Sequence, residues 1–137
     1  REDVLRLPFE ARFAYDEAQD ILFLNFEKLE VRDMAMVEAI HAKVVAICEP
    51  LRRKVYAVVN YEGFELARDL EDAYAAMVQD VVSRYYADVT RYTTSSFMRA
   101  KLGDALRTRE LAPHVYESEQ EAVAHLAGRD GAGVLHR

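Results

Sequence analysis

The segment "RYTTSSFMRAKLG", residues 91–103, contains the residue types that bind phosphate and carboxylate groups in proteins. Cationic side chains stand on both sides of a hydroxyl cluster, with Arg91 before it and Arg99 and Lys101 after it. Hydroxyl groups, cations and the free N–H groups of a helix start are donors suited to an anion. One chemistry that this segment could support is therefore the binding of a small anion. The hydroxyl cluster consists of Thr93, Thr94, Ser95 and Ser96.

The same cluster also has a purely structural explanation. A strand over residues 88–94 would end in the cluster, and Ser95 or Ser96 would then cap the following helix. The remaining hydroxyls would satisfy the turn, and Arg91 would point from the strand to water. No glycine lies within residues 93–96, whereas phosphate-binding loops use glycine to let the backbone approach the ligand. We therefore expect helix capping, with an anion site as the alternative.

A second polar loop, "NYEGFELARD" at residues 60–69, follows another expected strand. If the two strands are neighbours, the two loops form a shared polar lip, because ligands of open α/β sheets gather where strands end. Gly63 fits a turn that needs a positive φ. We expect a solvated loop without a ligand, with a ligand site as the alternative. The candidate ligand-binding residues are Asn60, Glu62, Arg68, Arg91, Thr94, Ser95 and Ser96.

The other reactive residue types show no catalytic or metal-binding pattern. Cys48, the single cysteine, has no CxxC partner and is predicted to be a small core residue. Ser95 and Ser96 lack the Gly-x-Ser-x-Gly setting of a hydrolase nucleophile. The sequence therefore predicts no catalytic residue, no metal site and no cofactor in this domain. The histidines without metal-ligand spacing are His41, His114, His125 and His136.

The composition indicates which binding partners and which cellular compartment suit this protein. The 137 residues carry a formal net charge of −6 and no basic run longer than Arg52-Arg53-Lys54, which argues against nucleic acid as a partner. One cysteine fits a reducing, cytoplasmic compartment. We find no apolar run long enough to span a membrane and no secretory signal. We expect the tyrosines, eight in all, to pack mainly in the core, with a docking surface or a homo-oligomer as the alternative.

Hydrophobic periodicity predicts an α/β fold. The expected helices begin at Asp33, after the loop at 60–69, after Ser95 or Ser96, and at the capping box of Ser118 and Glu121. The order is ββαβαβαβα, which predicts a mixed, mostly parallel sheet covered by helices. The expected strands are residues 9–15, 21–26, 54–60, 88–94 and 112–118.

The same reading predicts one domain. Residues 1–8, which end in a proline, are expected to form an entry linker, and residues 9–127 the single domain. The glycine-rich residues 128–137 are expected to form a flexible tail. The chain begins with arginine rather than methionine, so we expect it to be part of a longer protein.

The element order resembles the STAS-type fold of anti-sigma-factor antagonists, over residues 9–127. Members that act as phosphorylation switches carry a serine in the loop that enters the second helix. Here that place reads "GFELARD", residues 63–69, without serine or threonine. The resemblance therefore implies the architecture and not a phosphorylation switch.

Four segments resemble a narrower group, the extra C-terminal domain of some bacterial acyl-CoA:acetate/3-ketoacid CoA-transferases. The parent family transfers CoA through a glutamyl-CoA intermediate, and its catalytic glutamate lies in the upstream domains. Glu62-Gly63 lacks the Glu-x-Gly setting of that glutamate. The segments are "LFLNFEKLEVR" (22–32), "KVYAVVNYEGF" (54–64), "VTRYTTSSFMRAKLGDAL" (89–106) and "APHVYESEQEA" (112–122).

This resemblance implies an accessory domain that serves docking, assembly or regulation of upstream CoA-transferase domains. CoA would be the cofactor of the parent enzyme and not of this domain. The alternatives are a stand-alone STAS-like module that binds a small anion, lipid or acyl ligand, and a protein-interaction domain.

Overall fold

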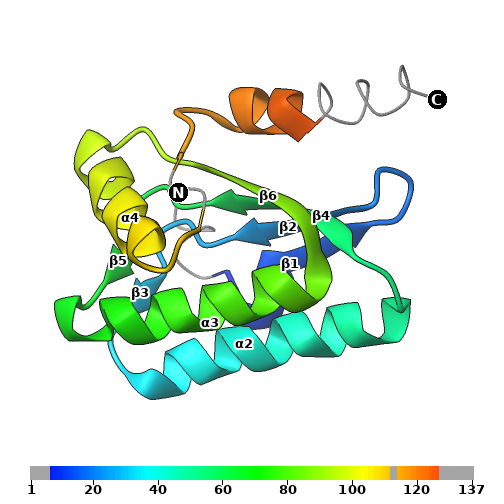
Figure 1. The fold of residues 1–137 in the computed structure, drawn as a ribbon, viewed down its shortest axis with the longest axis horizontal. Helices are drawn as coiled ribbons and strands as arrows, with labels where there is room; N and C mark the ends of the chain where they lie inside the picture. The colour runs from blue at the N-terminus through cyan, green and yellow to red at the C-terminus, as the bar shows by residue number, and fades with distance from the viewer. Residues whose placement is uncertain (1–6, 112–113, 127–137) are drawn as a thin grey trace.

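A four-stranded sheet forms the centre of the molecule in the computed structural model, which describes residues 7–111 and 114–126 (Figure 1). The strand order is β1-β2-β4-β6. β1 is antiparallel to β2, whereas β2, β4 and β6 are mutually parallel, so the predicted mixed, mostly parallel sheet is confirmed. The strands are β1 (Phe13–Asp16), β2 (Ile21–Asn25), β4 (Val55–Asn60) and β6 (Tyr86–Tyr92).

Two long helices, α2 (Met34–Cys48) and α3 (Glu71–Tyr85), run side by side along one face of the sheet (Figure 1). Their apolar sides and the inward residues of the strands form the main core. Asp33 caps α2 as predicted, with its carboxylate accepting a hydrogen bond from the Met36 N–H at 3.0 Å. Cys48 is buried in this core, which confirms the prediction for the single cysteine.

The opposite face of the sheet is covered by the helical residues 119–126 (Figure 1). Ala122 and Leu126 of this helix pack on Ile21 and Val58 and form a second, smaller core. The predicted cap is present, since the Glu121 N–H donates to Ser118 Oγ at 3.2 Å. No helix in the described part of the chain is long and apolar enough to cross a membrane.

A second sheet of two short parallel strands, β3 (Glu30–Val31) and β5 (Glu65–Leu66), was not predicted. Helix α4 (Ser96–Thr108) lies at this end of the molecule and packs against α3. Lys101 Nζ donates to the Leu66 carbonyl at 2.6 Å and pairs with a Glu71 carboxylate oxygen at 3.3 Å. Short 3₁₀ turns connect several elements of the described chain, namely η1 (Phe9–Arg12), η2 (Glu49–Leu51) and η3 (Arg68–Leu70).

The predicted first strand over residues 9–15 is wrong at its start, because β1 begins only at Phe13. Residues Phe9–Arg12 form η1 instead, and the Ala11 N–H donates to the Pro8 carbonyl. Arg12 is buried and donates to the carbonyls of Asn25 and Glu27 at 3.0 and 2.9 Å. These distant acceptors hold the chain in a turn.

In the described part of the predicted last strand, residues 114–118, the pairing with β6 is an isolated parallel bridge between Tyr92 and Tyr116. Residues 112–113 of that strand lie outside the described residues, as do residues 1–6 of the expected linker. The expected tail, residues 128–137, and His136 lie outside them as well.

Candidate functional site

The carboxyl-terminal edge of the sheet brings the two predicted loops together. Asn60 at the end of β4 pairs in register with Asn25 of β2 on one side and with Tyr92 of β6 on the other. The Tyr61 N–H donates to the Tyr92 carbonyl at 2.9 Å. The loop after β4 therefore lies directly beside the hydroxyl cluster after β6, as expected for neighbouring parallel strands.

A carboxylate of the protein itself occupies the hydroxyl cluster. Glu62 Oε1 accepts hydrogen bonds from Thr93 Oγ1 at 3.0 Å, from the Thr94 N–H at 2.9 Å and from Thr94 Oγ1 at 2.9 Å. Partial burial alone would raise the pKa of Glu62. The hydrogen bonds from Thr94 and Thr93 and the charge of Lys28 outweigh this effect, so the pKa of Glu62 lies below its usual range. The cluster thus binds an internal anion.

Asn60 fixes the loop that carries Glu62. Its side-chain carbonyl accepts from the Glu62 N–H at 2.8 Å, and its amide donates to Asn25 Oδ1 at 3.1 Å. Gly63 follows with a φ of +65°, which confirms the predicted positive φ. A Cβ atom at Gly63 would lie 3.1 Å from Lys28 Cγ in the loop after β2, so the Lys28 side chain would have to shift and the position favours glycine.

Ser95 is the helix cap of α4, as predicted. Its Oγ accepts from the Met98 N–H at 3.1 Å, and its own N–H donates to Thr93 Oγ1 at 3.2 Å. Ser96 is the first residue of α4 and is exposed. Arg99 donates to the Thr93 carbonyl at 2.8 Å, which stiffens the loop from the helix side. The hydroxyls of Thr93, Thr94 and Ser95 and the cations of Arg99 and Lys101 therefore have structural partners.

Arg91 and Arg68 do not join the other candidates. Arg91 pairs in register with Val59 and points to the face of the sheet that α2 and α3 cover, where it is only 2% exposed. It does not point to water, so this expectation is wrong. Arg68, in η3, lines a shallow cleft with Glu71 and Asp72. The structure thus groups Asn60, Glu62, Thr94 and Ser95, and it places Arg68 and Arg91 elsewhere.

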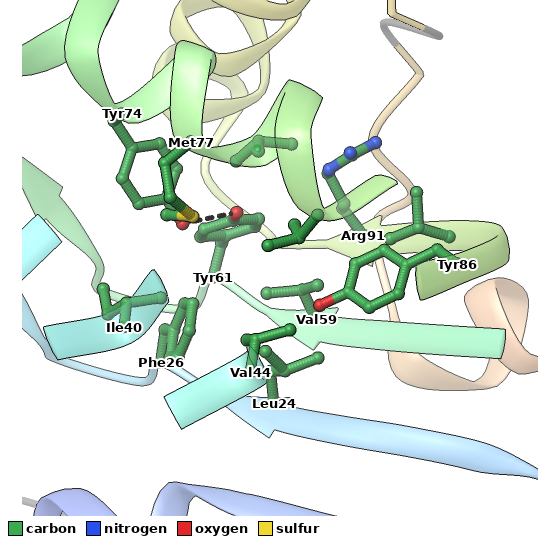
Figure 2. Close-up of a pocket in the computed structure, with 13 residues that line it drawn as sticks. Leu24, Phe26, Ile40, Val44, Val59, Tyr61, Tyr74, Met77, Tyr86 and Arg91 are labelled. Atoms are coloured by element: carbon green, nitrogen blue, oxygen red, sulfur yellow. Dashed lines mark hydrogen bonds between the residues drawn. The ribbon is translucent and has the colours of Figure 1, made fainter. Parts of the chain in front are cut away.

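Arg91 lines a small internal cavity between the sheet and the two long helices (Figure 2). Its volume is about 20 Å³, which is room for about one water molecule. The hydroxyls of Tyr61 and Tyr74 are hydrogen-bonded to each other at 2.8 Å beside it (Figure 2). Burial raises the pKa of Tyr61, of Tyr74 and of Tyr86, so these phenols stay neutral. These three tyrosines are buried, as core packing requires, and the sequence did not predict the cavity.

A larger open cleft of about 690 Å³ lies between the start of α4 and the helical residues 119–126. Tyr116 OH is hydrogen-bonded to His125 Nδ1 at 2.7 Å, and His125 Nε2 lies 3.5 Å from Asp88 Oδ2. These contacts join the last helix to β6. Sequence spacing did not indicate this group, because Asp88 and His125 come from distant parts of the chain.

Within residues 7–111 and 114–126, histidine, cysteine and carboxylate side chains form no group of three that could hold a metal ion. Comparisons of this chain with protein-family models, with curated proteins and with solved structures found no match.

Proposed function

We propose that this chain is an accessory, non-catalytic domain of a cytoplasmic acyl-CoA:carboxylate CoA-transferase. In this proposal it has a STAS-like architecture and docks on the upstream catalytic domains, which hold CoA and the reactive glutamate. The proposal rests on the four segments that resemble such domains.

One spatial observation carries the proposal. The four segments are separated along the chain, yet parts of all of them meet at the carboxyl-terminal edge of the sheet. The register joins Asn25, Asn60 and Tyr92 across β2, β4 and β6, and the bridge adds Tyr116. Segments that resemble one family and meet at one edge are what a shared docking surface requires.

The geometry of this edge favours docking over chemistry. The donors of residues 93–95 hold Glu62 and the start of α4, so they shape a rigid loop pair. Directly beside this loop pair, Phe97 is 73% exposed in the first turn of α4. Aromatic side chains of this kind are enriched in the buried centres of interfaces. We place Phe97 at the contact with the catalytic domains.

The reading frame that encodes residues upstream of Arg1 is the first test. A CoA-transferase catalytic domain in that frame supports the proposal, and a frame without one contradicts it. The second test compares hydrogen exchange of residues 93–99 between the 137-residue chain and the longer protein. We expect slower exchange in the longer protein, because the contact covers Phe97.

Met34 supplies the matched control, since it is the other exposed large apolar side chain among the described residues, at 43%, and it also lies in the first turn of a helix. Phe97→Ala should abolish the added protection of residues 93–99, whereas Met34→Ala should leave it in place. Equal exchange in the two proteins, or CoA transfer by the 137-residue chain alone, would overturn the proposed role.

A further inference from the structure

A cluster of positive charge lies at the opposite, amino-terminal end of the parallel strands. Arg52, Arg53, Lys54 and Arg84 line one open cleft of about 270 Å³, which we call the basic cleft. Its remaining walls are Cys48, Glu49 and Tyr85. The gathering of four cations and one carboxylate is unusual for a chain whose formal net charge is −6.

The fold builds the basic cleft from two chain segments that turn at the same place. Figure 1 shows α2 and α3 ending at the same end of the molecule, where the chain enters β4 and β6. Val55 at the start of β4 pairs with Tyr86 at the start of β6, which places the residues before each strand side by side. Lys54 and Tyr85 are these preceding residues.

Arg52 adopts a backbone conformation that arginine rarely takes. Its φ is +61°, in the left-handed region, where glycine or asparagine would be less strained. Strained residues persist where the surrounding structure or a function demands them. This turn directs the chain so that Arg52 and Lys54 line the same cleft.

Two of the four cations already have partners. Arg53 donates to Tyr15 OH at 2.6 Å and to Asp20 Oδ1 at 3.1 Å. Arg84 donates to Asp80 Oδ2 at 3.1 Å and to Tyr85 OH at 2.6 Å. Its guanidinium carbon lies 4.8 Å from the centroid of the Tyr85 ring, so Arg84 is held in a fixed orientation.

The other two cations, Arg52 and Lys54, are exposed and have no hydrogen-bond or ion-pair partner among the residues that the structure describes. Glu49, the one carboxylate of the cleft, accepts a hydrogen bond from Tyr85 OH at 2.6 Å. It lies 3.8 Å from Arg84 Nη2, on the side already occupied by paired groups. The cleft therefore holds an excess of positive charge.

We propose that the basic cleft binds the phosphate group of a phosphorylated ligand. Arg52 and Lys54 donate charge-assisted hydrogen bonds to the phosphate oxygens, and the fixed Arg84 completes the positive wall. The small volume fits a phosphate or diphosphate group, and the negative net charge disfavours a long nucleic acid. This inference does not depend on the proposed function.

Cations near helix carboxyl termini also stabilise the helix dipole, and this explains Arg84 in the last turn of α3. The dipole effect falls off within the last turn of a helix. Arg52 directly follows η2 and can share this role, whereas Lys54 lies six residues after Cys48, the end of α2, so the helix dipole does not account for Lys54.

The test titrates the 137-residue chain with inorganic pyrophosphate and with inorganic phosphate by calorimetry and thermal unfolding. Sodium chloride at equal ionic strength is the reference, because salt screens exposed charges. We expect saturable binding and a raised Tm with pyrophosphate. The double variant Arg52→Gln/Lys54→Gln should weaken binding by about tenfold or more, since two charge-assisted hydrogen bonds are lost.

The control is Arg32→Gln/Arg107→Gln, which removes the same charge from two exposed arginines elsewhere. It should leave pyrophosphate binding within about twofold, because screened distant charges contribute little. Unligated Arg52→Gln/Lys54→Gln should unfold at nearly the Tm of the parent chain. No saturable binding of any probe, or an equal loss in both double variants, would overturn the proposal.

Vesicles separate the two sources of a phosphate group. Sedimentation with phosphatidylcholine vesicles that contain phosphatidic acid, compared with pure phosphatidylcholine, reports a lipid headgroup. Binding to these vesicles that depends on Arg52 and Lys54, without binding of pyrophosphate, assigns a lipid headgroup. Pyrophosphate binding assigns a soluble phosphate ester or diphosphate.

Discussion

Both ends of the parallel strands carry hydrogen-bond donors that suit an anion, but only the donors at one end are paired with a carboxylate of the protein itself. At the carboxyl-terminal edge, where ligands of α/β sheets usually bind, Thr93 and Thr94 hold the carboxylate of Glu62. At the amino-terminal end, Arg52 and Lys54 project into an open cleft without a partner in the described part of the chain. Residue types alone therefore overestimate a binding site, because donors that are already paired offer little to a ligand.

The pairing differs because of where the anion comes from. Glu62 lies in the loop after the neighbouring strand β4, and Asn60 and the positive φ of Gly63 fix this loop. No equivalent carboxylate of the described chain lies against Arg52 and Lys54, since Glu49 accepts a hydrogen bond from Tyr85. The donors at the carboxyl-terminal edge therefore already bind an anion within the folded chain. Arg52 and Lys54 at the amino-terminal end would gain an anionic partner only from a ligand.

Removing the internal anion should have the largest effect. Glu62→Ala leaves the buried Thr93 hydroxyl and the Thr94 N–H without their acceptor, which should lower the free energy of unfolding by about 2 kcal/mol. Chemical denaturation of the variant and of the parent chain measures this loss. Glu65→Ala, an exposed glutamate of β5, is the control and should change stability by less than about 0.5 kcal/mol.

The emptied cluster should then accept an external anion. Acetate should restore part of the stability of Glu62→Ala, compared with chloride at equal ionic strength, because acetate carries the missing carboxylate. A variant that loses no stability, or that gains nothing from acetate, would show that the hydroxyl cluster does not act as an anion site.

A smaller effect is expected from the turn that positions Glu62. Gly63→Ala forces a Cβ into the left-handed region and against Lys28, which should destabilise the chain by about 1–2 kcal/mol. The loss should persist in the Glu62→Ala background only in part, because both changes act on one loop. A double-mutant cycle by denaturation measures the coupling, and strict additivity would contradict a shared role.

Protonation should weaken the same contact without any mutation. The pKa of Glu62 is lowered in the folded chain, so its contribution is fully present above the ordinary carboxyl pKa of about 4.3 and is lost as the pH falls through the lower folded value. The stability difference between the parent chain and Glu62→Gln should therefore shrink at acidic pH. Denaturation curves over a pH series measure it, and a constant or growing difference would contradict the assigned cause.

Local features of this site were predictable from sequence, and long-range ones were not. Ser95 as a cap and Gly63 with a positive φ follow from preferences of neighbouring residues. Glu62 reaches its donors across more than thirty residues of sequence, so its place depends on the pairing of β4 with β6. The inward direction of Arg91 depends on that same register, because a shift by one residue moves a side chain to the other face.

In the fold, too, local features were predictable from the sequence and long-range ones were not. The helices and the central strands follow from hydrophobic periodicity, which each segment carries by itself. The late start of β1 depends on Arg12 and its acceptors, the carbonyls of Asn25 at the end of β2 and of Glu27 just after it. The β3–β5 pair consists of two-residue strands, which are too short to show a period. Contacts between distant segments decide both features.

The smallest expected effect on stability lies at the basic cleft, and its sign is opposite. Arg52→Asn places a residue that tolerates the left-handed region at a φ of +61°, which should raise the free energy of unfolding by about 0.5 kcal/mol. The same change removes a cation from the cleft and should weaken pyrophosphate binding. Denaturation and calorimetry on one variant then give a gain in stability with a loss of binding. That opposition is the mark of a residue kept for a ligand, whereas at Glu62 a loss of the contact lowers stability, because there the protein supplies its own ligand.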